Sequence, residues 1–81
     1  MFNKIELKIE VWGESQKIYV AKQLISFHVK YSVIDRQESG TEYNMRVNKK
    51  QLCYIINYIA PLSNVYVNMR LCDGSYVFLA G

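Results

Sequence analysis

Residues 4–11 alternate between charged and apolar side chains without a break, in the order Lys-Ile-Glu-Leu-Lys-Ile-Glu-Val. Successive side chains of a strand point to opposite faces, so this period of two gathers the apolar residues on one face. That face carries Ile5, Leu7, Ile9 and Val11. The Lys and Glu side chains then face water. The pattern predicts a strand with one buried and one wet face, which is typical of antiparallel sheets.

Two further stretches in the first half of the chain also alternate. Leu24–Ile34 predicts one long strand, whose apolar face carries every second residue from Ile25 to Val33. A polar loop at Asp35–Gly40 separates it from Glu42–Val47, which predicts the next strand.

The stretch at 17–23 fits two interpretations. Ile18 and Val20 alternate as they would in a strand, whereas Ile18, Ala21 and Leu24 could line a short helical turn. We favour the strand, because a continuous extended segment would then run on toward residue 34.

The end of the chain predicts a hairpin. Residues 65–71 alternate, and Asp73-Gly74 is a favoured pair for a two-residue type I′ turn. Such a turn sets Arg70 opposite Val77 and leaves Val77 and Leu79 on the outer face, so the last strand could be central. The expected core face of the hairpin carries Val65, Val67, Met69, Leu71, Tyr76, Phe78 and Ala80.

Residues 49–60 predict an amphipathic helix. Asn48 is a suitable N-cap, and Gln51 stands three residues later, as in a capping box. Pro61 cannot continue a helix, so it marks the end. The apolar stripe, at positions i, i+3, i+4 and i+7, consists of Leu52, Ile55, Ile56 and Ile59.

The 81 residues give room for one domain, residues 1–81. The predicted order is β-β-β-α-β-β. We therefore expect an α+β fold, with an antiparallel sheet of about five strands and one helix packed on one face.

The chain carries few of the groups that catalysis or metal binding requires. His28 is the single histidine, the glycines are isolated, and the two cysteines, Cys53 and Cys72, are expected to be buried thiols. We predict no enzyme, cofactor or metal site. No apolar run is long enough to cross a membrane, and the first residues form no signal peptide, so a cytoplasmic protein without membrane contact is expected.

Seven tyrosines in 81 residues favour a binding surface. Tyr66, Asn68 and Arg70 share the outer face of their strand, and Tyr54 and Tyr58 flank the helix stripe one turn apart. These residues predict a non-catalytic protein-binding module. Small inhibitors of larger protein complexes made by phages and mobile elements have this character. Its partner would be a larger protein or a second copy, as a homodimer.

The alternative is a small nucleic-acid-binding domain that uses its sheet face. The net charge is +3, and basic side chains that could meet phosphates are scattered along the chain. They are His28, Lys30, Arg46, Lys49 and Lys50. The two lysines lie in the first turn of the helix, where the helix dipole disfavours positive charge. No segment resembles the signature motif of a known family.

Overall fold

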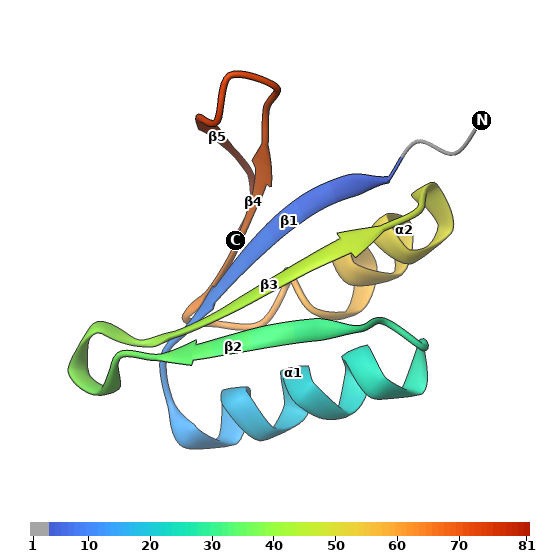
Figure 1. The fold of residues 1–81 in the computed structure, drawn as a ribbon. Coiled ribbons are helices and arrows are strands. Elements are labelled where there is room, and N and C mark those ends of the chain that lie inside the picture. Colours follow the sequence, from blue (N-terminus) through green and yellow to red (C-terminus); the bar gives the residue numbers. More distant parts are fainter. Residues whose placement is uncertain (1–3) are drawn as a thin grey trace.

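The computed structural model describes residues 4–81, which form one antiparallel five-stranded sheet covered by two helices (Figure 1). The strands lie side by side in the order β2-β3-β1-β4-β5. In chain order the elements are β1 (Ile5–Val11), α1 (Glu14–Ser26), β2 (Tyr31–Asp35), the short 3-10 helix η1 (Gln37–Ser39), β3 (Thr41–Val47), α2 (Lys49–Tyr58), β4 (Val65–Arg70) and β5 (Tyr76–Ala80).

The α+β class and the five antiparallel strands are confirmed, whereas the prediction of a single helix is wrong. The connectivity from β1 to β4 is that of a split βαβ arrangement, to which β5 adds an edge strand. Both helices lie on the same side of the sheet, so no helix of residues 4–81 covers its other face (Figure 1).

Strand β1 occupies the centre of the sheet, as its alternation allows. Ile9 pairs with Tyr43 on β3 and with Val67 on β4, and all three side chains are buried. From the helix layer, Val20 and Leu24 of α1, Ile55 of α2 and the C-cap residue Ile59 complete this core. Burying an aliphatic side chain of this size stabilises the fold by about 1.5–3 kcal/mol.

The segment predicted as strand at 17–23 is the middle of helix α1. Val20 and Leu24, one turn apart, point into the core, while Ile18 and Ile25 are more than half exposed. The exposed Ile18 and the buried Val20 alternate as in a strand, although they lie on different sides of the helix, so the period of two is misleading here. The N-cap position is Gly13, which offers no side-chain oxygen, and so the usual helix start signal is missing.

The long strand predicted at 24–34 is wrong in its first part, because α1 extends to Ser26 and β2 begins only at Tyr31. His28 adopts a left-handed backbone with φ 61°, a position that usually carries glycine. The Val29 amide donates to the Leu24 carbonyl at 2.9 Å, and the His28 amide donates to the Ile25 carbonyl at 3.0 Å. These two bonds form a Schellman motif, which turns the chain toward β2.

Helix α2 confirms its predicted start. The Gln51 amide donates to Asn48 Oδ1 at 2.8 Å, and the Asn48 amide donates to Gln51 Oε1 at 2.9 Å. These reciprocal bonds form the capping box. The helix ends at Tyr58, shortly before Pro61.

The final hairpin has a three-residue loop, so its predicted register is wrong by one residue. The Leu71 amide donates to the Ser75 carbonyl at 2.8 Å, and the Gly74 amide donates to the Leu71 carbonyl at 3.0 Å. Gly74 has φ 89°, as expected for a turn followed by a left-handed glycine. Arg70 therefore pairs with Tyr76, and Met69 with Val77.

This shift reverses the faces of residues 76–78, because strand side chains alternate. A bulge between Val67 and Asn68 then sets Ala80 opposite Val67, so Ala80 packs against the core as predicted. Tyr76 and Phe78, predicted to lie in the core, lie on the outer face instead, and Leu71 is also exposed. Val77, opposite Met69, falls on the helix side but is 40% exposed, and Leu79 is partly buried against the core. Strand β5 is an edge strand and not a central one.

Candidate functional site: the outer face of the sheet

The uncovered face of the sheet carries different side chains at its centre and at the β5 edge. On the central strands β1 and β3 the outward residues are charged or polar, and on the β4–β5 hairpin they include aromatic rings. The hairpin set consists of Tyr66, Asn68, Arg70, Tyr76 and Phe78, and is called the hairpin face below.

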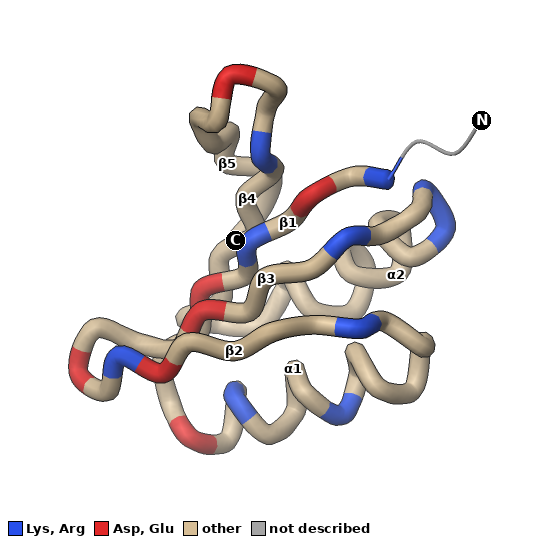
Figure 2. The backbone as a smooth tube through the Cα atoms, in the orientation of Figure 1, with Lys and Arg blue, Asp and Glu red and all other residues tan. Residues whose placement is uncertain are grey.

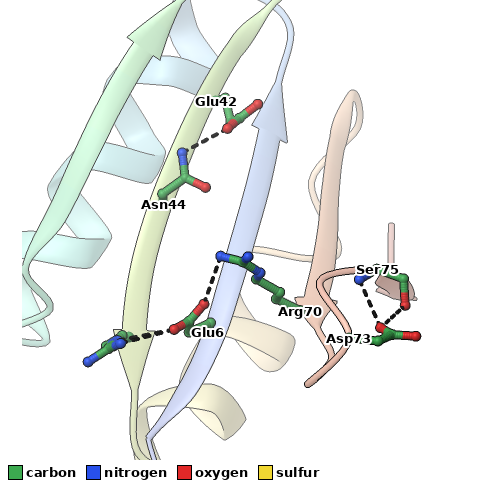
Figure 3. Close-up of polar contacts among 7 residues, drawn as sticks. Glu6, Glu42, Asn44, Arg70, Asp73 and Ser75 are labelled. Carbon is green, nitrogen blue, oxygen red and sulfur yellow. Dashed lines mark hydrogen bonds and ion pairs between the residues drawn. The ribbon is translucent and has the colours of Figure 1, made fainter.

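Ion pairs organise the centre of this face. Glu6 on β1 accepts from Arg46 Nη2 at 3.1 Å on one side and from Arg70 Nη1 at 3.5 Å on the other. Figure 3 shows Arg70 reaching from β4 toward Glu6. The charges therefore largely compensate one another within the sheet.

Glu42 on β3 is held ionised at the other end of the strand. Partial burial raises the pKa of its carboxyl, but hydrogen bonds from Asn44, at 2.8 Å, and from Arg36 outweigh this effect. The net result is a pKa below the ordinary value for glutamate. At neutral pH this carboxylate is a structural ion-pair partner on the sheet surface.

The hairpin face is the most exposed aromatic surface of the sheet. Tyr66, Tyr76 and Phe78 are 38%, 42% and 56% exposed, although large rings are usually covered. The centroid of the Tyr66 ring lies 6.4 Å from that of Phe78 and 5.6 Å from that of Trp12. The Trp12 and Tyr66 rings meet edge-on. Lys8 Nζ lies 4.1 Å from the centre of the Tyr76 ring, in a cation–π contact.

Polar contacts hold the rest of the hairpin in place. Asn68 donates to Glu10 at 3.4 Å, and Arg70 is tethered by Glu6. At the tip, Asp73 Oδ1 accepts from the Ser75 amide at 2.9 Å and from its hydroxyl at 2.6 Å (Figure 3). The Ser75 hydroxyl and amide together hold the pKa of Asp73 below its ordinary value. The loop is thus ordered by its own side chains.

The structure places the predicted outer-face residues together and adds two that the sequence analysis assigned to the core. Tyr66, Asn68 and Arg70 lie side by side on β4, as expected. Their neighbours across the hairpin are Tyr76 and Phe78, not Val77 and Leu79. Asp-Gly occurs in two-residue hairpin loops and also at the end of three-residue loops. The three-residue interpretation of this turn would have predicted Tyr76 and Phe78 on the outer face.

Tyr54 and Tyr58 lie in the helix layer, away from the hairpin face. The Tyr54 ring stacks on Phe27 with centroids 3.9 Å apart, and its hydroxyl donates to Gln23 Oε1 at 2.6 Å. Tyr54 therefore joins α2 to α1 and has a structural role. Tyr58, whose ring is 4.7 Å from Tyr54, remains 55% exposed.

The residues predicted to meet nucleic-acid phosphates gather at one end of the molecule. Lys30 precedes β2, Arg46 is near the end of β3, and Lys49 and Lys50 begin α2. His28, predicted within a strand, lies instead in the turn after α1. Lys4, immediately before β1, joins this group. No local pattern in the sequence predicts this, because the pairing of Ile5 with Val47 brings it there.

Both cysteines are free and exposed, so the prediction of buried thiols is wrong. Cys53 lies on the outward side of α2, and Cys72 lies in the exposed hairpin loop. Within residues 4–81 there is no cluster of three or more His, Cys, Asp or Glu side chains that could hold a metal ion. No helix in this part of the chain is both long and apolar enough to cross a membrane.

Comparison with known proteins gives no relative: no family model matches the chain, and neither a curated protein nor a solved structure is significantly similar. The functional argument therefore rests on the surfaces described above.

Proposed function

We propose that this domain is a non-catalytic protein-binding module and that the hairpin face contacts its partner. The observation that carries the proposal is the exposure of Tyr66, Tyr76 and Phe78 on a sheet face that no helix covers. The adjacent edge strand β5, Tyr-Val-Phe-Leu-Ala, has no charged residue and no partner strand on its outer side among residues 4–81. Aromatic residues and arginine are enriched at protein interfaces.

The charges of the sheet face favour a protein over a nucleic acid at this place. Glu6, Glu10 and Glu42 are interleaved with the basic side chains of β1, β3 and β4. The central strands present no exposed aromatic ring, since Tyr43 points into the core. A base-stacking platform across the sheet, as in single-stranded RNA recognition, therefore has little support here.

A small module of this kind would act by covering a site on a larger protein. In the finer form of the proposal, it is an inhibitor of a larger complex, of the type made by phages and mobile elements. Small size and an aromatic binding surface fit this role. Self-association through the same face is the other form of protein binding.

The test compares the double variant Tyr66→Ala/Phe78→Ser with wild type in affinity capture from a host lysate. Central interface aromatics contribute about 2 kcal/mol or more each, so at least a 30-fold loss of affinity for any captured partner is expected. Ile25→Ser is the matched control, because Ile25 is a well exposed apolar residue on α1. The amount of partner captured by Ile25→Ser should equal that captured by wild type.

Light scattering after size exclusion gives the second readout. A wild-type dimer that the double variant reduces to a monomer would identify the second copy as the partner. Far-UV circular dichroism must show that both variants are folded. If folded Tyr66→Ala/Phe78→Ser retains every interaction of wild type, the hairpin face is not the binding surface.

A further inference from the structure

Half of the basic side chains of this chain gather at one end of the fold. Strand pairing sets Lys4 next to the end of β3, beside Arg46, while Lys30 immediately precedes β2 on the other side of β3. Lys49 and Lys50 follow β3 directly, in the first turn of α2. Figure 2 shows the Lys and Arg positions concentrated where β1 starts, β3 ends and α2 begins. This surface, with His28, is called the basic end below.

The charges of the basic end are mostly uncompensated. Among the residues that the structure describes, Arg46 pairs with Glu6, while Lys4, Lys30, Lys49 and Lys50 form no ion pair. At the opposite end, Lys17 pairs with Glu14 and Asp35. Elsewhere in residues 4–81, Arg36 pairs with Glu42 and Arg70 with Glu6, whereas Lys8 and Lys22 form no ion pair. The basic end stands out because it gathers four unpaired lysines in one place.

Helix α2 gains no stability from the two lysines in its first turn. Lys49 and Lys50 stand at the positive end of the α2 dipole, where acidic residues are stabilising and basic ones are not. The Asn48–Gln51 capping box already satisfies the amides at this terminus. The positive charge therefore adds to the potential of the helix end and attracts anions.

The composition of the basic end favours a nucleic acid over an acidic protein. An open depression of about 540 Å³ is lined by Lys4, His28, Lys30, Arg46 and Gln51, all of them polar. Protein interfaces are depleted in lysine and have an apolar centre, whereas nucleic-acid interfaces are polar and strongly positive. Among residues 4–81, no aromatic ring lines this depression, so contact with phosphates rather than base stacking is expected.

We propose that the basic end binds the phosphate backbone of duplex nucleic acid without sequence preference. It is a second binding surface, beyond the hairpin face. Duplex DNA is the preferred form, because its charge density along the axis is higher than that of a single strand. Five phosphate contacts predict a slope of about −4.5 for log affinity against log salt, or roughly a 500-fold loss between 50 and 200 mM salt.

The experiment measures fluorescence anisotropy of a labelled 20-base-pair DNA duplex against the whole chain. The test variant is Lys30→Gln/Lys49→Gln, and the control is Lys22→Gln/Arg36→Gln, whose residues lie outside the basic end. Each pair lowers the net charge from +3 to +1. The test variant should bind more weakly and lose only about 40-fold over the same salt range, since two phosphate contacts are removed.

A labelled polyglutamate peptide serves as the competing anion, and it should bind more weakly than the duplex. The proposal is overturned if wild type fails to bind the duplex at 50 mM salt. An equal loss in the two variants would also overturn it, because net charge alone would then explain binding. Tighter binding of polyglutamate would assign the basic end to an acidic protein. Each outcome is independent of the hairpin face, which both variants leave intact.

Discussion

Gly40 is the residue at which a single methyl group should disturb the fold most specifically. It lies buried between η1 and β3, with φ 90° and ψ −178°, a conformation that is essentially restricted to glycine. A Cβ at this position would lie 2.7 Å from Cε2 and 2.9 Å from Nε1 of Trp12. Real Cβ atoms do not approach other atoms so closely, so the Trp12 ring would have to move.

The cost of Gly40→Ala follows from these two features. The backbone strain costs about 1–3 kcal/mol. Displacing Trp12 weakens its edge contact with Tyr66, which contributes about 0.5–1.5 kcal/mol. The lower entropy of the unfolded alanine chain offsets about 0.4–1 kcal/mol. We therefore expect a net loss of about 2 kcal/mol in the free energy of unfolding.

Gly74→Ala is the matched control, because Gly74 also has a positive φ but a Cβ there collides with nothing. Gly74 has φ 89°, and a Cβ there would meet only Arg70 Nη2, at 3.8 Å. Gly40→Ala should therefore be the more destabilising variant by about 1 kcal/mol.

Urea denaturation followed by circular dichroism and by fluorescence measures both variants. Trp12 is the single tryptophan, so its emission reports directly on the ring that must move. The emission of the folded protein should shift in Gly40→Ala and stay unchanged in Gly74→Ala. If Gly74→Ala costs as much as Gly40→Ala, or if the emission does not shift, the predicted collision is wrong.

Two further predictions concern charge. Hydrogen bonds from the Gln37 amide and, to a smaller extent, from Lys17 hold the pKa of Asp35 below its ordinary value. The stability that this carboxylate contributes is therefore present above about pH 4 and is lost as the pH falls through the folded-state pKa. The urea midpoint should therefore fall less between pH 6 and pH 3 in Asp35→Asn than in wild type. An equal fall would show that Asp35 is not the source of this pH dependence. Lys49→Glu should raise the free energy of unfolding by about 0.5 kcal/mol, because it places an acid at the N-terminus of α2. Lys22→Glu, in the middle of α1, should leave the free energy of unfolding unchanged. If both variants raise it equally, the lower net charge, and not the helix dipole, is the cause.

The last prediction connects stability with the proposed function of the basic end. A lysine that the helix disfavours is expected where binding matters more than stability. Lys49→Glu should therefore increase stability and weaken duplex binding together. Asn48, which caps the same helix terminus, contributes to stability without carrying charge.

Glu6 lies between the two proposed surfaces. It accepts from Arg46, which belongs to the basic end, and from Arg70, which belongs to the hairpin face. An open hollow of about 380 Å³ is lined by these three residues together with Asn44 and Tyr76, among others. The two surfaces are therefore adjacent, and variants of Glu6 would affect both of them. Variants that separate the two surfaces are therefore Tyr66→Ala/Phe78→Ser, on the hairpin face alone, and Lys30→Gln/Lys49→Gln, on the basic end alone.

Local patterns were sufficient for about half of the elements. The alternation of residues 5–11 predicted β1, because a buried face and a wet face leave a period of two in the sequence. The Asn48 cap and the stripe through Ile55 and Ile59 predicted α2, because a capping box and an i, i+4 stripe involve only neighbouring residues. The α+β class followed from these elements.

The sequence does not predict helix α1, because only a narrow side of this helix is buried. Val20 and Leu24 are its fully buried residues. Ile18 and Ile25 face outward, but each lies two residues before another apolar residue, Val20 or Phe27, as in a strand. Gly13 at the N-cap and His28 at the left-handed C-terminal position replace the usual signals. Packing against the sheet selects the helix, and packing involves residues that are distant in the chain.

The amino-acid sequence alone was enough to identify β1, α2 and the Tyr66–Asn68–Arg70 side of the hairpin, since each depends on residues a few positions apart. The tertiary structure decided the rest of both surfaces. A loop of three residues instead of two brings Tyr76 and Phe78 outward, since one residue of register reverses a strand. Pairing of β1 and β2 with β3 gathers Lys4, Lys30 and Lys49, because only a folded sheet brings its strand ends together.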